Sequence, residues 1–301
     1  MTEIKLSRSW SGVAALLAAL GAAPASASSG VTLMHVHGLS YSVDGKRLFV
    51  PSHVGLAIYS EGRWSKAPGP EHDFMGFSAT REGMYSSGHP APGSSLRNPF
   101  GLLKSTDGGR TWEHLGLAGE ADFHVMAASY GAPIVYAYTP IPNSRMSRPG
   151  IYYTPDDGKT WTASGGKGLS GRIAALAVHP SLAGVLAAAT QSGVYVSEDR
   201  GDSFAAAAAG PQATSVAFDL DGAHLWFGGY RNAATLTRME LKTRKGEPIP
   251  IPAMTKDAVA YIAQNPANRR QYAIATFTRD VYLSSDAGKT WKQIAARGET
   301  R

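Results

Sequence analysis

The stretch Ser105-Thr106-Asp107-Gly108-Gly109-Arg110-Thr111-Trp112 (STDGGRTW) decides the fold, because close variants of it recur along the chain. The other copies are TPDDGKTW at 154–161, SEDRGDSF at 197–204 and SSDAGKTW at 284–291. We call the shared pattern, Ser/Thr-x-Asp-x-Gly-x-Thr/Ser-Trp/Phe, the Asp-box. Its Asp can accept hydrogen bonds from the local backbone and its Gly permits a positive φ, so each copy predicts a hairpin turn. We therefore expect a structural role for its carboxylates, which are Asp107, Asp156, Asp199 and Asp286.

The spacing of the copies predicts the number of repeats. The motifs start at residues 105, 154, 197 and 284, so successive starts are 49, 43 and 87 residues apart. The last spacing covers two repeats, with an eroded motif near TRMELKTRKG (237–246), and a worn turn, SEGRW (60–64), precedes the first motif. Short alternating runs such as RLFVPS and GVYVSED fit four strands per repeat. The sequence thus predicts an all-β, six-bladed β-propeller with four-stranded blades and Asp-box hairpin turns.

The first 27 residues have the composition of a secretory signal. A basic start with Lys5 and Arg8 precedes the apolar run GVAALLAALGAA and the small-residue end Ala25-Ser26-Ala27. We expect a signal peptide at 1–27 and a single propeller domain at 28–301, in a periplasmic or secreted protein. The apolar run is too short to span a bilayer, so no membrane insertion is expected.

Composition limits the chemistry further. The chain has no cysteine, so a soft metal site would have to use His or Met. The net charge of +6 is carried by scattered Lys and Arg, and we expect no nucleic-acid partner.

Polar residues recur at equivalent positions of the first three repeats. The segments HVHGLS (35–40), DFMGFS (73–78) and HVMAAS (124–129) superpose as the innermost strand of each blade, and FVPSH (49–53) superposes on YSSGH (85–89). Alternation along a strand points residues at i and i+2 to the same side. The predicted cluster, on the face opposite the Asp-boxes, contains His35, His37, His53, His72, His89, His124, Met75, Met126 and Asp73.

This cluster predicts a transition-metal site. Imidazole suits copper, zinc and nickel, and thioether adds a preference for Cu(I), so copper is favoured and zinc is the alternative. Met75 and Met126 are candidate soft ligands, while His35, His72 and Asp73 are ligands or groups that orient them. An open coordination position would permit catalysis by a metal-bound water, although no catalytic residue or substrate can be named. The ligands of first choice are His37, His53, His89 and His124.

The segments HVHGLSYSVDGKRLFV, HDFMGFS, SSGHP and NPFGLLKSTDGGRTWE resemble the secreted bacterial Asp-box (BNR-repeat) β-propellers of the sialidase-like and sortilin-like superfamily, usually labelled glycosyl-hydrolase-like. The resemblance covers essentially the whole mature chain. It implies a second hypothesis, a sialidase-like glycoside hydrolase that binds a carbohydrate or another small polar ligand. The Arg-Ile-Pro signature of sialidases is absent near the mature start. The candidate residues for hydrolysis are Glu71, Asp73, Asp122, Arg97, Arg145 and Arg148.

Sortilin-type propellers and propeller assembly factors imply a third hypothesis, a platform that binds a protein or peptide. Exposed aromatic side chains between the second and third strands would suit this role. The candidates are Tyr138, Tyr230 and Phe277.

Overall fold

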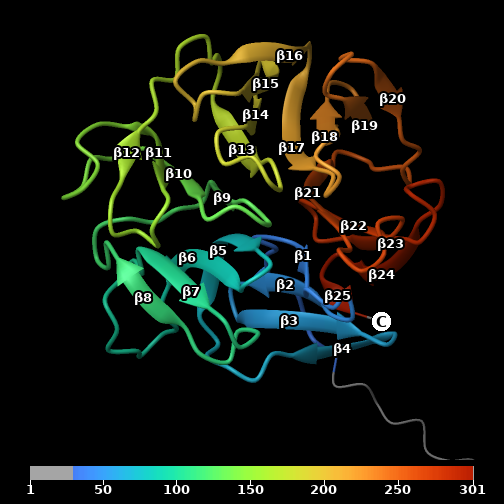
Figure 1. Cartoon of the computed structure of the whole chain (residues 1–301). Helices are drawn as coiled ribbons and strands as arrows, with labels where there is room; N and C mark the ends of the chain where they lie inside the picture. The colour runs from blue at the N-terminus through green and yellow to red at the C-terminus, as the bar shows by residue number, and fades with distance from the viewer. Residues whose placement is uncertain (1–29, 301) are drawn as a thin grey trace, which may run out of the picture.

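The computed structural model describes residues 30–300 and confirms the six-bladed propeller. Figure 1 shows six antiparallel sheets arranged as a ring around a central axis. No helix occurs in residues 30–300, so none is present there that could cross a membrane. The predicted signal peptide lies outside the described residues.

The first three blades contain twelve strands in chain order, innermost strand first. Blade 1 consists of β1 (Ser40–Tyr41), β2 (Leu48–Ser52), β3 (Gly55–Ser60) and β4 (Arg63–Lys66). Blade 2 consists of β5 (Asp73–Ala79), β6 (Met84–His89), β7 (Leu102–Ser105) and β8 (Glu113–Gly116). Blade 3 consists of β9 (Met126–Ala128), β10 (Val135–Thr139), β11 (Gly150–Thr154) and β12 (Thr162–Ala163).

The last three blades repeat this order, and blade 6 gains a fifth strand. Blade 4 consists of β13 (Ile173–Val178), β14 (Leu186–Thr190), β15 (Gly193–Ser197) and β16 (Ala205–Ala209). Blade 5 consists of β17 (Gln212–Phe218), β18 (His224–Tyr230), β19 (Ala234–Glu240) and β20 (Gly246–Pro248). Blade 6 consists of β21 (Val259–Gln264), β22 (Tyr272–Thr276), β23 (Val281–Ser284), β24 (Lys292–Ala296) and β25 (Glu299–Thr300).

The four Asp-boxes form the turns between the third and fourth strands of blades 2, 3, 4 and 6. In the first, Asp107 accepts hydrogen bonds from the Ser105 hydroxyl (2.9 Å), the Arg110 amide (3.0 Å) and both the amide and hydroxyl of Thr111 (3.0 and 2.7 Å). Gly109 has φ +86°, as the turn requires. The Ser/Thr hydroxyls at the first and seventh positions of the motif donate equivalent hydrogen bonds to Asp156, Asp199 and Asp286.

The ring is closed where the two ends of the described chain meet beside blades 1 and 6 (Figure 1). The Leu33 amide donates to the Gly298 carbonyl (2.8 Å), and Thr32 forms a bridge to Glu299 of β25. The Trp64 indole donates to the Ile294 carbonyl (2.9 Å). The same closure holds the segment 34–37, which follows directly, at one face of the disc.

Candidate functional site

The polar cluster lies on the face opposite the Asp-boxes, at the ends of strands in blades 1 to 3. His35 and His37 precede β1, and His53 follows β2. Asp73 begins β5, and His89 ends β6. The connection from β8 to β9 adds Asp122 and His124.

His35, His37 and His53 form what we call the three-histidine group. The rings of His37 and His53 stack with centroids 4.8 Å apart and planes inclined by 8°, and the His35 ring lies 4.3 Å from that of His53. One nitrogen from each ring can be chosen so that all three lie within 4.8 Å of one another. Three imidazole nitrogens this close could ligate a single metal ion.

Asp73 closes the three-histidine group from blade 2. Its Oδ1 lies 3.6 Å from His37 Nε2, and its Oδ2 lies 3.7 Å from His53 Nε2. Both His37 Nε2 and Asp73 Oδ1 are buried, and neither has a hydrogen-bond partner among the described residues. Burial lowers the pKa of His37 to about 4, with further lowering by the His53 and His35 rings, so His37 is neutral at physiological pH. Burial also raises the pKa of Asp73.

His89, Asp122 and His124 form a second set, which we call the mixed group. Asp122 Oδ2 lies 2.6 Å from His124 Nε2 and 3.1 Å from His89 Nε2. The other nitrogen of His89, Nδ1, lies 2.6 Å from the side-chain oxygen of Asn98. Burial of Asp122 is outweighed by its hydrogen bond with His124 and by the charges nearby, which together lower its pKa, while the same bond raises the pKa of His124.

Two glycines allow the backbone to bring these groups together. Gly76 has φ +56°, and a Cβ there would collide with the carbonyl oxygen of Phe123. Gly88 has φ +118°, and a Cβ there would collide with the carbonyl oxygen of Asp73. Phe123 itself is fully buried, and its amide donates to the Ser87 hydroxyl (3.0 Å). The connection that carries Asp122 and His124 on either side of Phe123 is therefore fixed against blade 2.

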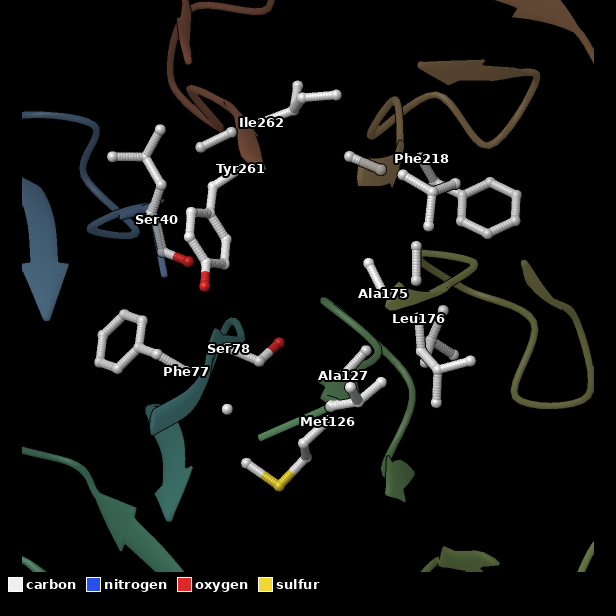
Figure 2. Close-up of a pocket in the computed structure, with 18 of the residues that line it drawn as sticks. Ser40, Phe77, Ser78, Met126, Ala127, Ala175, Leu176, Phe218, Tyr261 and Ile262 are labelled. Carbon is white, nitrogen blue, oxygen red and sulfur yellow. The ribbon is translucent and has the colours of Figure 1, made fainter. Parts of the chain in front are cut away.

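Three predicted ligands have other neighbours. His72 Nδ1 accepts a hydrogen bond from the Ala91 amide (3.0 Å), and its ring packs edge-on against Phe100, which leaves only Nε2 for another partner. Met75 and Met126 are buried, and Met126 belongs to a core cluster with Phe123. Figure 2 shows the Met126 sulfur directed away from the middle of the axial cavity. Metal ligation by these three residues stays a prediction.

Several of the residues considered for carbohydrate hydrolysis bond to groups outside the histidine cluster. Glu71 forms an ion pair with Lys66 (2.5 Å). Arg145 donates to the Gly158 carbonyl (2.6 Å), and Arg148 donates to the Ser164 carbonyl (3.1 Å), so both guanidinium groups hold loops. Sequence reasoning placed Asp122 in this set and missed its contact with the histidines. Its separation of two residues from His124 was the available signal, because both then point to one side.

Within residues 30–300, a third group of acidic and histidine side chains lies on the Asp-box face and is paired with an arginine. Asp219, Asp221 and His224 approach one another in blade 5. Asp219, however, accepts hydrogen bonds from Arg238 Nε (2.9 Å) and the Tyr272 hydroxyl (2.6 Å). An arginine beside a carboxylate opposes cation binding, so this group is a structural ion pair.

A cavity of about 530 Å³ lies on the axis of the disc, lined by the innermost strands of all six blades. Figure 2 shows Ser40, Ser78 and Tyr261 around it, together with apolar side chains. His37 and His124, one from each group, also line this cavity. A small molecule could therefore approach both groups through the same space.

Large apolar side chains are also exposed on the face that carries the site. The exposed large hydrophobic residues on this face come from the segment before β1 and from the loops between second and third strands. They are Met34, Leu96, Ile141 and Phe277, with exposed fractions of 49%, 42%, 69% and 62%. Phe277 is the one aromatic proposed for partner binding that belongs to this exposed set. Protein or peptide binding by this face stays a prediction.

Comparison with known proteins supports the fold. No family model and no curated protein matches the chain. Among solved structures, a GH74 enzyme from Niastella koreensis is similar over 88% of this chain and 46% of its own, with a TM-score of 0.62 and 15% identity. The GH74 xyloglucanase from Xanthomonas campestris is similar over 89% and 46%, with a TM-score of 0.56 and 17% identity.

A third similar structure, YCF48 bound to D1 peptide, has a TM-score of 0.51 and 18% identity over 88% of this chain and 83% of its own. The chain spans about half the length of the GH74 enzymes. At these identities the likenesses establish the propeller fold and leave the chemistry to the residues of the site.

Proposed function

We propose that this protein is an exported propeller that binds a transition-metal ion. Nitrogens of His35, His37 and His53 are three of the ligands, and a carboxylate oxygen of Asp73 is the fourth. The observation that carries the proposal is the facing pair of buried, unpartnered atoms, His37 Nε2 and Asp73 Oδ1, 3.6 Å apart. Buried polar atoms normally have a partner, because an unmade hydrogen bond costs about 1–3 kcal/mol. A cation between them would bind both the imidazole lone pair and the carboxylate charge.

Copper is the preferred ion and zinc the alternative. A set of imidazoles and one carboxylate suits both divalent ions, and affinity for nitrogen ligands is higher for Cu(II) than for Zn(II). Because the pKa of His37 is about 4, its ring needs to release no proton on binding at neutral pH. The resemblance to secreted Asp-box propellers and the N-terminal sequence support a periplasmic or secreted location. Metal ions from outside the cell reach a protein there without entering the cytoplasm.

The test is a titration of metal-free protein, carrying no His-tag, with Cu(II) and Zn(II) against a chelator of known affinity. The double variant His37→Ala/His53→Ala should lose the tightest site. The control is His114→Ala, which removes an exposed imidazole from the outer strand β8. If the double variant keeps the affinity of the wild type, the proposal is wrong.

A second candidate, glycoside hydrolysis, is favoured by the pair Asp73 and Asp122. Burial raises the pKa of Asp73, whereas hydrogen bonding to His124 outweighs burial and lowers that of Asp122. Two carboxyl groups shifted apart in this way can serve as acid and base. Hydrolysis of xyloglucan oligosaccharides by metal-free protein, lost in both Asp73→Asn and Asp122→Asn, would favour this function over metal binding.

A further inference from the structure

We propose that the site holds two metal ions, the second bound by the mixed group, His89, Asp122 and His124, with Asp73 between the two. This inference rests on the proposed function, because it assigns the first ion to the three-histidine group. The mixed group offers two imidazoles and a carboxylate whose ligand atoms lie within 4.8 Å of one another. Its predicted ligand is a first-row divalent cation, Cu(II) or Zn(II).

The orientation of His89 supports a cation in the mixed group. The side-chain oxygen of Asn98 can only accept a hydrogen bond, so at 2.6 Å it assigns the proton to His89 Nδ1. In the neutral ring this leaves the lone pair of Nε2 facing a carboxylate oxygen of Asp122 at 3.1 Å. Either a proton on Nε2 or a cation bound to both atoms makes this contact favourable, and a metal ion can take the place of that proton. A metal-binding histidine is commonly fixed in this way by a hydrogen bond from its other nitrogen.

Asp122 also has an atom left for a ligand. Its Oδ2 contacts both histidines, whereas its Oδ1 is buried and has no hydrogen-bond partner within residues 30–300. The amide of the neighbouring Phe123 donates to the Ser87 hydroxyl, which anchors the backbone beside Asp122. The unpartnered oxygen thus belongs to an anchored stretch of the chain.

Asp73 joins the two groups. Its carboxylate faces His37 and His53, while its backbone pairs directly with that of His89 across the β5–β6 ladder. A carboxylate close to two cations offsets their mutual repulsion.

The two positions differ in character. The three-histidine group supplies imidazole nitrogens, whereas the mixed group supplies an acidic oxygen beside two imidazoles. One member of each group, His37 and His124, lines the axial cavity. Two ions here would present open positions to the same space, so that one small oxygen-donor molecule could bind to both.

The experiment is a titration of metal-free, tag-free protein with Cu(II), followed by calorimetry and electron paramagnetic resonance. We expect two equivalents of Cu(II) to bind. The electron paramagnetic resonance signal should lose intensity when the second Cu(II) couples magnetically to the first. The pair His89→Gln/Asp122→Asn should remove one equivalent and leave the other within about threefold of its wild-type affinity. The pair His37→Ala/His53→Ala should remove the other equivalent instead.

Substitutions of Asn98 test whether the proton of His89 lies on Nδ1. Asn98→Ala should weaken the second equivalent about tenfold, and Asn98→Asp, whose carboxylate still accepts from Nδ1, should restore it. A merely structural role for Asn98 would change the unfolding temperature without separating the two equivalents.

Other outcomes overturn the two-ion centre. One equivalent that survives His89→Gln/Asp122→Asn but not His37→Ala/His53→Ala would leave the proposed function intact and exclude the second ion. One equivalent lost in both pairs would show a single ion shared by the two groups. No binding at all in the wild type would contradict the proposed function itself.

Discussion

The two faces of the disc use the same side chain, aspartate, in opposite ways. On the Asp-box face, Asp107 accepts four hydrogen bonds from its own turn. On the other face, Asp73 and Asp122 each keep a buried oxygen with no partner among the described residues, and they lie beside imidazoles. A saturated carboxylate stabilises a turn, whereas an unsaturated one has capacity for a ligand. The carboxylates that maintain the propeller thus differ from the proposed metal ligands in whether all their oxygens are hydrogen-bonded.

The largest effect is expected when one ligand is removed from each group. In His37→Ala/His124→Ala, the affinity for Cu(II) should fall at least about 100-fold, because both groups lose an imidazole that lines the axial cavity. The fold should persist, since neither side chain belongs to a core cluster of the described residues. Competitive titration measures the affinity and circular dichroism the fold. Unchanged affinity would show that these histidines do not bind the metal, so that the two faces would no longer differ in function.

Exchanging a single carboxylate on the site face should have an intermediate effect. Asp73→Asn removes the negative charge that faces His37 and His53, so Cu(II) affinity should fall about 10- to 100-fold. The unfolding temperature of the metal-free protein should not fall, because burial already disfavours this carboxylate, as its raised pKa shows. A variant that loses stability but keeps its affinity would place Asp73 with the structural carboxylates.

The matched change on the other face should give the reverse result. Asp107→Ala removes the acceptor of four hydrogen bonds and should lower the free energy of unfolding by about 1–2 kcal/mol. Metal affinity should be unchanged. Denaturant unfolding and the same titration check the two parts, and weaker metal binding in this variant would contradict the separation.

The smallest effect concerns acid. The backbone hydrogen bond from Thr111, with the side-chain bonds of the turn, lowers the pKa of Asp107 from 3.8 to about 2. A group whose folded pKa is lowered stabilises the protein above its unfolded pKa, and this contribution disappears as the pH falls through the folded value. The difference in unfolding free energy between wild type and Asp107→Ala should therefore be constant from neutral pH to about pH 4.5 and shrink towards pH 2. A difference independent of pH would show that the turn needs the side chain but not its charge.

The fold could be predicted from the sequence because the turns are local. Each Asp-box brings its own donors and acceptor within eight residues, so four copies fixed the third and fourth strands of four blades. The eroded segments 60–64 and 237–246 indeed connect β3 to β4 and β19 to β20. Repetition then supplied the number of blades.

The site could be predicted only in part, because its contacts are made between blades. Alignment of repeats brought His37, His53 and Asp73 to one face, where the structure joins them. It could not assign Asp122 to His89, since that contact depends on how closely the β8–β9 connection approaches β5 at Gly76. Nor could it show the bond of His72 to the Ala91 amide, because that bond forms within a long loop that has no counterpart in blade 1.

Elemental analysis of the mature wild-type protein, exported and purified without a His-tag, tests the central claim most directly. We expect near-stoichiometric copper or zinc, retained through gel filtration and absent from His37→Ala/His124→Ala prepared in parallel. Metal content at the background level in the wild type, followed by no tight binding of added Cu(II) or Zn(II), would contradict the proposed metal site.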